Sequence, residues 1–76
     1  MSVQENFGKN VRRVREGKGW SQDKLSDETG LHRTYISGIE RGVRNPTIKI
    51  AQTIADALGI ELGTLFIQER EGSGSK

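Results

Sequence analysis

The chain contains no cysteine, and its 76 residues include only one histidine and four aromatic side chains. Without cysteine, neither a disulfide framework nor a thiolate metal site can form. A lone histidine has no second ligand at metal spacing, so we expect no metal. The sequence also lacks a nucleophile–base pair and a glycine-rich phosphate loop between a strand and a helix. These absences argue against an enzyme and against a bound cofactor.

Long apolar runs are also missing. No stretch approaches the ~20 residues that a helix needs to cross a bilayer. The polar start of the chain lacks the pattern of a signal peptide. We therefore expect a soluble, cytoplasmic protein with no membrane partner. Hydrophobic residues make up only 32% of the chain, and dimerisation would help so small a domain to fold stably.

Charge is distributed unevenly, although the formal net charge is only +2. Residues 1–50 carry ten Lys or Arg and six Asp or Glu, whereas residues 51–76 carry two and four. A basic half is typical of a surface that meets phosphates. On charge alone, an ordinary solvated surface remains the simpler interpretation.

The apolar periodicity predicts an all-α bundle of five short helices, over residues 3–17, 21–28, 32–41, 48–58 and 61–68. Ser2, Ser21 and Thr47 are suited to cap the first, second and fourth helices, because their hydroxyls can accept from unpaired N–H groups. No strand signal is present. We expect one domain over residues 1–67 and a flexible tail over residues 68–76, which have no apolar anchor.

Residues 20–46 predict two short helices joined by a turn at Gly30, which tolerates the positive φ that such a turn often needs. In the second helix, Ile36 and Ile39 are expected to face inward. The exposed positions carry small or hydrogen-bonding residues, namely Arg33, Thr34, Ser37 and Gly38. A helix of this size can lie in the major groove of double-stranded DNA and offer such side chains to base edges.

Taken together, these motifs resemble the Cro/phage-repressor (XRE-type) helix-turn-helix family of DNA-binding regulators. The matching pieces are Ser21-Gln22, Leu25-Ser26, Thr29-Gly30-Leu31, ISGIERG over residues 36–42, NPTI over 45–48, and IADALGI over 54–60. The resemblance covers roughly residues 5–67. The stretch RTYISGIERGVRNPT is most similar to the small controller proteins of restriction–modification systems. It implies a lambda-repressor-like domain that binds a pseudopalindromic operator as a homodimer and regulates transcription.

Arg33 is the main candidate for reading bases, because its guanidinium can bond both O6 and N7 of guanine. The alternatives are a phosphate contact or an ordinary surface charge. The resemblance implies that Gln22 contacts the sugar-phosphate backbone and supports the second helix. The resemblance also implies that the loop after the second of these helices, which carries Arg44 and Asn45, contacts phosphates or the minor groove. The predicted DNA-binding residues are Gln22, His32, Arg33, Thr34, Tyr35, Ser37, Arg41, Arg44 and Asn45.

Three positions in this segment have alternative interpretations. His32 is either a helix cap or a phosphate contact. Tyr35 either packs on the domain and bonds a phosphate or belongs purely to the core. Gly38 costs ~1 kcal/mol of helix propensity. We expect Gly38 to let the backbone approach DNA closely, so that more of the specificity rests on DNA shape.

Other residues are expected to hold the protein together. The resemblance implies that Arg15 and Glu40 form a partly buried ion pair between the first and third helices, whose loss can cost ~3–5 kcal/mol. The predicted dimer interface consists of Ile50, Leu62, Leu65, Phe66 and Ile67. The alternative is that Leu62, Leu65 and Phe66 complete the core of the monomer. No small-molecule ligand is expected.

Two rival functions remain open at this stage. An antitoxin would bind a protein partner in addition to its own operator. A protein-interaction adaptor would use the fold without reading DNA, although the basic half and the polar second helix argue against it. Salt-dependent DNA binding would separate the adaptor from the regulator.

Overall fold

The computed structural model describes residues 2–68. It contains the helices α1 (Val3–Gly17), α2 (Gln22–Thr29), α3 (Arg33–Glu40) and α4 (Ile48–Leu58), followed by the 3-10 helix η1 (Leu62–Phe66). No strand occurs among these residues. The all-α class is confirmed, and each end of the four α-helices lies within one residue of its predicted position.

The expected count of five α-helices is not confirmed, because residues 62–66 form a 3-10 helix where an α-helix over 61–68 was predicted. Short 3-10 segments are common, and glycine at position 63 disfavours a regular helix. The Nδ2 atom of Asn10 in α1 donates to the carbonyls of Leu65 and Ile67, both at 2.8 Å. These carbonyls are therefore satisfied from α1, without a further helical turn. Residues 69–76 of the predicted tail lie outside the described residues, and a domain end at residue 67 stays a prediction.

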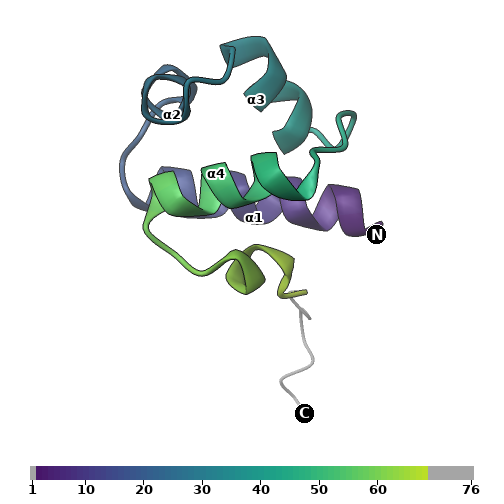
Figure 1. Cartoon of the computed structure of the whole chain (residues 1–76). Coiled ribbons are helices and arrows are strands. Elements are labelled where there is room, and N and C mark those ends of the chain that lie inside the picture. Colours follow the sequence, from purple (N-terminus) through teal and green to yellow (C-terminus); the bar gives the residue numbers. More distant parts are fainter. Residues whose placement is uncertain (1, 69–76) are drawn as a thin grey trace.

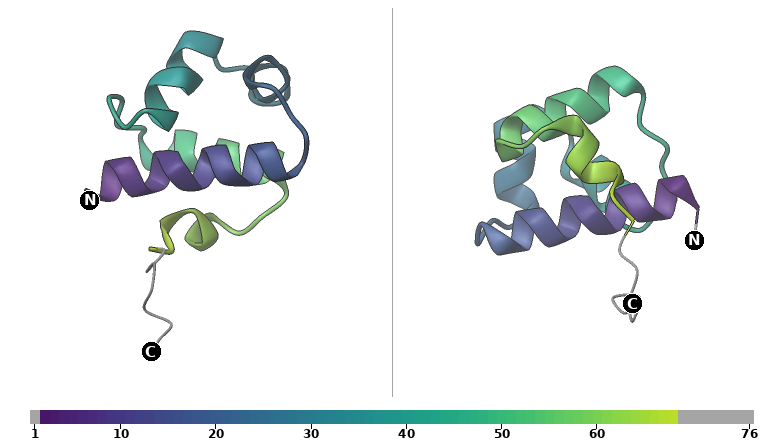
Figure 2. Two further views of the ribbon diagram at one scale, coloured as in Figure 1. Left: turned by 180° about the vertical axis from the view of Figure 1, so that it is seen from behind. Right: turned by 90° about the horizontal axis from the view of Figure 1, so that it is seen from below.

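The helices are arranged around α1 and α4, which lie beside each other in the middle of the molecule (Figure 1). α2 and α3 lie on one side of this pair, and η1 lies on the opposite side. Seen from below, η1 crosses between α1 and α4 (Figure 2). This arrangement leaves α3 and the start of α2 on an outer face of the molecule, far from η1.

Every element contributes to the core. The largest fully buried side chains come from α1, α2, α3, α4 and η1, and they are Val11, Leu25, Ile36, Ile39, Ile54 and Leu65. The inward orientation predicted for Ile36 and Ile39 is confirmed, and Leu25 is also buried. Burial of this kind stabilises a domain by roughly 1.5–3 kcal/mol for each large aliphatic side chain.

The helices begin where the sequence predicts caps. The Ser2 hydroxyl accepts from the backbone N–H of Glu5 at 3.0 Å, and the Glu5 carboxylate accepts from the N–H of Ser2, forming a capping box. The hydroxyls of Ser21 and Thr47 also accept from the first turns of α2 and α4. Each such cap is worth about 1 kcal/mol.

Gly8 allows α1 to pack closely against the end of α3. A Cβ atom at position 8 would overlap the carbonyl oxygen of Ile39 and would lie 2.9 Å from the carbonyl oxygen of Glu40. Because these are backbone atoms, no side-chain rotation can make room for it. Only glycine fits at this contact, which the sequence pattern did not single out.

Candidate nucleic-acid interface

The turn between α2 and α3 is fixed by local hydrogen bonds. Gly30 adopts φ +78° and donates its N–H to the carbonyl of Ser26 at 2.8 Å. The hydroxyl of Thr29 donates to the carbonyl of Leu25 at 2.8 Å and accepts from the N–H of Leu31 at 3.1 Å. The angle between the two helices is therefore determined by backbone and hydroxyl contacts as well as by the core.

A buried ion pair joins the end of α3 to α1. Arg15 donates from Nε to Oε2 of Glu40 at 2.7 Å and from Nη2 to Oε1 at 2.9 Å, so the pair is bidentate. Only 9% of the Arg15 side chain and 3% of the Glu40 side chain are exposed. Mainly through the hydrogen bond with Glu40, the pKa of Arg15 is raised above its ordinary value.

The same carboxylate also receives a bond from α2. Gln22 donates from Nε2 to Oε1 of Glu40 at 3.1 Å, while Arg15 donates from Nη1 to the carbonyl of Trp20 at 2.7 Å. Glu40 therefore ties the end of α3 and the start of α2 to α1. The structure places Gln22 where it supports α3, which is one of the two roles expected for it.

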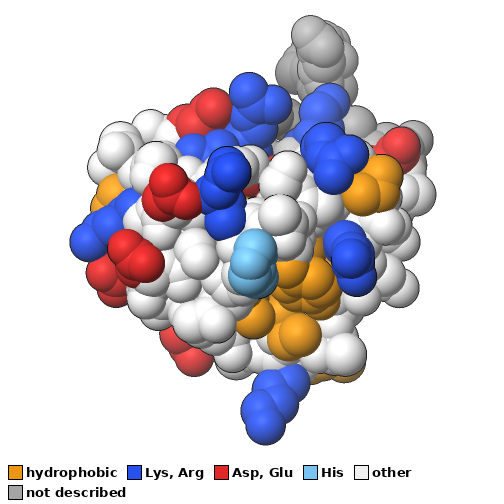
Figure 3. All heavy atoms as spheres, turned by 90° about the horizontal axis from the view of Figure 1, so that it is seen from above, with side chains coloured by type: hydrophobic (Ala, Val, Ile, Leu, Met, Phe, Trp, Pro, Cys, Tyr) orange, Lys and Arg blue, Asp and Glu red, His pale blue; other side chains and the backbone are white. Residues whose placement is uncertain are grey.

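The predicted base-reading residues lie at the start of α3. Arg33 and Thr34 are exposed, and Ser37, one turn later, is half-buried. Figure 3 looks onto the side of the molecule that carries α2 and α3, where basic side chains surround His32 and a small hydrophobic area. This face of the molecule carries basic, polar and acidic side chains, with most of the acidic ones on the left of the view (Figure 3).

His32 acts as the N-cap of α3. Its Nδ1 atom accepts from the backbone N–H of Thr34 at 3.1 Å and lies 2.8 Å from the Thr34 hydroxyl. Of the two roles left open for His32, the structure shows the cap. The Thr34 hydroxyl is held in place by this contact, on an exposed part of the helix start.

Gly38 does not lie on the exposed face, which corrects the expectation that it lets DNA approach the backbone. It is buried, and a Cβ atom there would lie 2.5 Å from Cγ of Arg44. The loop after α3 brings Arg44 back over Gly38, where the guanidinium lies 5.6 Å from the centre of the Tyr35 ring. The carbonyl of Gly38 accepts the backbone N–H groups of Val43 and Arg44, which holds this loop in place.

The remaining predicted DNA-binding residues flank the same helix. Arg41, Arg44 and Asn45 are exposed in the loop between α3 and α4. Tyr35 is half-buried and packs against the core, with Arg44 over its ring. The structure therefore brings all nine predicted residues to α2, α3 and the adjoining loop.

Sequence reasoning missed three further contacts on this part of the molecule. The Oδ1 atom of Asp23 lies 3.2 Å from the Nε atom of Arg33. The amines of Lys18 and Lys24 lie 4.8 Å and 5.5 Å from the centre of the Trp20 ring. No spacing in the sequence signals these contacts, because they join side chains on different elements or across a turn.

The residues predicted for a dimer interface differ in burial and separate into three groups. Leu65 is wholly buried in the monomer core, so its assignment to an interface is corrected: the side chain has no surface left to offer a partner. Ile50 and Leu62 are half-buried against the core. Phe66 and Ile67 remain 43% and 59% exposed. Leu65 therefore completes the core of the monomer, which was the alternative to a place in the dimer interface.

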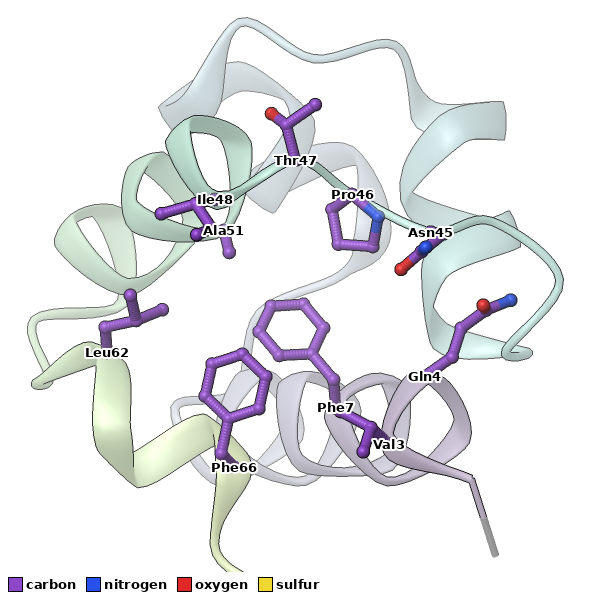
Figure 4. A pocket seen from close by; sticks show the side chains of 10 residues that line it. All are labelled: Val3, Gln4, Phe7, Asn45, Pro46, Thr47, Ile48, Ala51, Leu62 and Phe66. Carbon is purple, nitrogen blue, oxygen red and sulfur yellow. The ribbon is translucent and has the colours of Figure 1, made fainter.

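An apolar pocket of about 190 Å³ lies beside Phe66, between the start of α1, the start of α4 and η1 (Figure 4). The rings of Phe7 and Phe66 meet at its floor, with their centroids 5.1 Å apart. Val3 and Ile48 line it and are 71% and 80% exposed. The sequence did not predict that Val3 and Ile48 line one pocket, because they begin two helices that are far apart along the chain.

Neither a metal site nor a membrane span is found in the described part of the chain. Residues 2–68 contain no cluster of three or more His, Cys, Asp or Glu that could hold an ion. No helix among them is both long and apolar enough to span a bilayer.

The fold and the interface together define a helix-turn-helix protein. The chain belongs to the helix-turn-helix family, whose model matches residues 11–65. It is 50% identical over 56 residues to the control protein C.BamHI of Bacillus amyloliquefaciens, which covers 72% of this chain and 69% of that protein. The protein is a transcriptional regulator related to the restriction–modification control proteins, as the resemblance in its sequence indicated.

Solved structures support the same relationship. The restriction–modification controller protein C.AhdI from Aeromonas hydrophila superposes with a TM-score of 0.80 at 41% identity, covering 83% of this chain and 96% of that one. The controller protein C.Esp1396I, solved as a tetramer with its natural 35 base-pair operator, gives a TM-score of 0.79 at 35% identity, with 87% of each chain covered.

Proposed function

We propose that this protein is a restriction–modification controller that binds a pseudopalindromic operator as a homodimer and regulates transcription there. The observation that carries the proposal is the rigid mounting of α3. Its start presents Arg33 and Thr34 to solvent, while Glu40 at its end is tied to α1 and α2. The 50% identity to C.BamHI supports the narrower assignment to a controller.

In this proposal α3 lies in the major groove with its first turn deepest. Arg33 bonds O6 and N7 of a guanine, and Thr34 and Ser37 contact neighbouring bases or phosphates. Because Thr34 is already oriented by His32, it loses little further freedom on binding. A bidentate contact of this kind discriminates against a wrong base by about 1–3 kcal/mol.

The flanking residues would position α3 by contacting the DNA backbone. Gln22 has two hydrogens on Nε2, so it can donate one to Glu40 and the other to a phosphate. Arg41, Arg44 and Asn45 follow α3 on an exposed loop, where their side chains can meet phosphates. His32 and Tyr35 are placed beside these contacts. Such contacts set the register of the helix on the duplex without reading sequence.

A single recognition helix reads only a few base pairs, so a specific operator needs two copies of the protein. In a two-fold dimer, the two α3 helices would enter successive major grooves about 34 Å apart. We assign the exposed Phe66 and Ile67 to the dimer contact, with the half-buried Leu62 and Ile50 at its border. C.Esp1396I, whose structure is a tetramer with its operator, supports an oligomeric assembly on DNA.

The proposed activity requires neither catalysis nor a cofactor. The relatives are named as control proteins and transcriptional regulators, and the work assigned to the residues above is binding alone. Because the bacterial operator is in the cytoplasm, we place the protein there.

Footprinting on DNA upstream of the protein's own gene tests the operator, and Arg33→Ala tests the reading of bases. We expect wild-type protein to protect two half-sites and methylation of one guanine N7 per half-site to block binding. Arg33→Ala should fold normally but lose sensitivity to methylation at that guanine, with operator affinity reduced by about 1–3 kcal/mol per contact. Unchanged affinity and unchanged methylation sensitivity would refute the assignment of Arg33.

A further inference from the structure

Asp23 and Arg33 join the two helices of the helix-turn-helix on its outer surface. Asp23 lies in the first turn of α2, and Arg33 is the first residue of α3. The distance from Oδ1 of Asp23 to Nε of Arg33 is 3.2 Å. Both side chains are largely solvent-exposed, at 79% and 57%. The pair therefore lies on the surface assigned to DNA rather than in the core.

This ion pair contributes little to the fold. Exposed pairs stabilise proteins only slightly, because water screens them and two flexible side chains must be ordered. α2 and α3 are already joined by the buried side chains of Leu25, Ile36 and Ile39. Asp23 also places a negative charge beside Gln22, where a phosphate is expected, and so weakens binding to DNA of any sequence. Asp23 in the first turn also favours the N-terminus of α2 by about 0.3–1 kcal/mol, but that effect needs no contact with Arg33.

The position of the carboxylate beside Arg33 points to a second role. The shortest contact between the two side chains is the one to Nε of Arg33, and no residue among 2–68 accepts a hydrogen bond from the two terminal nitrogens of Arg33. These two nitrogens form the fork that bonds O6 and N7 of guanine. A carboxylate next to Nε restrains the guanidinium and leaves these two nitrogens available to the groove. Without the carboxylate, the long Arg33 side chain would sample many rotamers and could settle on a nearby phosphate.

We propose that Asp23 is a positioning residue for Arg33, holding the guanidinium in the orientation that reads guanine and keeping it off the DNA backbone. The proposal rests on the proposed reading of bases by Arg33. The charge of Asp23 lowers the affinity for all DNA. The orientation that Asp23 gives to Arg33 raises the affinity only for DNA that carries the matching guanine. Its net effect is to increase discrimination between the operator and other DNA.

The test compares Asp23→Ala with Asp27→Ala, which removes the same charge from the same helix one turn later. The probe is a duplex selected by the wild-type protein from random-sequence DNA. In a second duplex, 7-deazaguanine replaces the guanine whose methylation blocks binding, which removes the N7 acceptor but leaves base pairing intact. The ratio of the two dissociation constants measures how well N7 is read. The same ratio is measured for Arg33→Ala and for the double variant Asp23→Ala/Arg33→Ala.

We expect Asp23→Ala to reduce the 7-deazaguanine ratio by roughly two- to fivefold, the range for the coupling of an exposed ion pair. Asp27→Ala should leave the ratio unchanged. Both variants should bind non-specific DNA more tightly than the wild type. In the Arg33→Ala background, removal of Asp23 should no longer change the ratio, because Asp23 acts only through Arg33.

Other outcomes overturn the proposal in distinguishable ways. If Arg33→Ala lowers the ratio but Asp23→Ala behaves like Asp27→Ala, the positioning role fails and the reading of bases by Arg33 stands. If Asp23→Ala still lowers the ratio without Arg33, Asp23 acts on the DNA directly and the proposal is wrong. If Arg33→Ala leaves the ratio unchanged, both the assignment of Arg33 and the role of Asp23 are overturned.

Discussion

At the scale of single residues, Glu40 joins three helices through one carboxylate. It belongs to α3 and accepts bonds from Arg15 of α1 and from Gln22 of α2. Because the carboxylate is buried, it depends on these partners to replace the water it has lost. The position of α3 therefore depends on the buried hydrogen bonds of Glu40 as well as on the apolar core.

Removing Arg15 would leave the buried Glu40 carboxylate without its counter-ion. We expect Arg15→Ala to lower the free energy of unfolding by about 3–5 kcal/mol, measured by urea denaturation. The matched control is Arg12→Ala, which removes an arginine from the same helix. Its side chain is 63% exposed and paired with Glu16, so the expected change is below about 1 kcal/mol. Equal losses in the two variants would contradict the structural role of Arg15.

At the scale of elements, local chemistry predicted the helices well. The starts of α1 and α4 could be predicted from the N-caps at Ser2 and Thr47, because cap hydrogen bonds join residues that are close in sequence. η1 could not be predicted in this way. Its carbonyls bond to Asn6 and Asn10, which are 55 to 61 residues away along the chain. Only the tertiary structure reveals that contact.

In the candidate interface, too, some residues follow from local sequence pattern and others are placed only by the tertiary structure. Arg33 and Thr34 could be located from the sequence, because their helix and its inward residues follow a regular period. Gly38 was placed on the wrong face, since its burial depends on the path of the loop that returns Arg44 over it. Asp23 was missed because an exposed carboxylate follows no pattern until its partner is placed next to it.

The contact between α1 and α3 gives a prediction at this scale. Gly8→Ala should destabilise the protein by about 1–3 kcal/mol or more, although alanine favours helices, because its Cβ overlaps backbone carbonyls of α3. Gly17→Ala is the control: it lies in the last turn of the same helix, where a Cβ meets nothing within 4 Å. The free energy of unfolding of that variant should rise by up to about 1 kcal/mol. Thermal unfolding of both compares them, and a stabilised Gly8→Ala would show that α1 and α3 pack less closely.

At the scale of the whole molecule, the proposed DNA-contacting surface and the proposed dimer contact lie apart from each other. The helix-turn-helix occupies one side of α1 and α4, and η1 with Phe66 occupies the other (Figure 1). A substitution on one surface can therefore be made without altering the other. The two properties of the proposed regulator, phosphate binding and self-association, can be tested separately.

Phosphate binding predicts a steep dependence on salt. If Arg41 and Arg44 each neutralise one phosphate, a dimer neutralises about four, and the log–log slope of affinity against salt is about −3.6. Arg44→Ala should reduce the magnitude of that slope by about 1.8. Arg12→Ala, outside the helix-turn-helix and paired with Glu16, should leave it unchanged. Fluorescence anisotropy on a labelled duplex at several salt concentrations measures the slopes, and a flat response would favour the adaptor over the regulator.

Self-association can be tested at Ile67 without disturbing the fold. Its side chain is 59% exposed, while its backbone carbonyl is held by Asn10 at 2.8 Å. Leu65 would be the wrong choice, because its wholly buried side chain supports the monomer. A carboxylate at position 67 would lose its water in the proposed interface, so Ile67→Asp should weaken the dimer by roughly 2–3 kcal/mol, about a hundredfold in dissociation constant.

Sedimentation equilibrium without DNA measures that change, with circular dichroism to show that the helices remain. The matched control is Val43→Asp, which places the same charge on a residue of similar exposure, 61%, in the loop after α3. It should leave dimerisation unchanged, because that loop lies on the side of the helix-turn-helix. If Ile67→Asp dimerises as well as the wild type, the two-fold contact lies elsewhere. The exposed Val3 and Ile48 at the apolar pocket (Figure 4) then become the surface to test, since they are the other large apolar side chains beside Phe66.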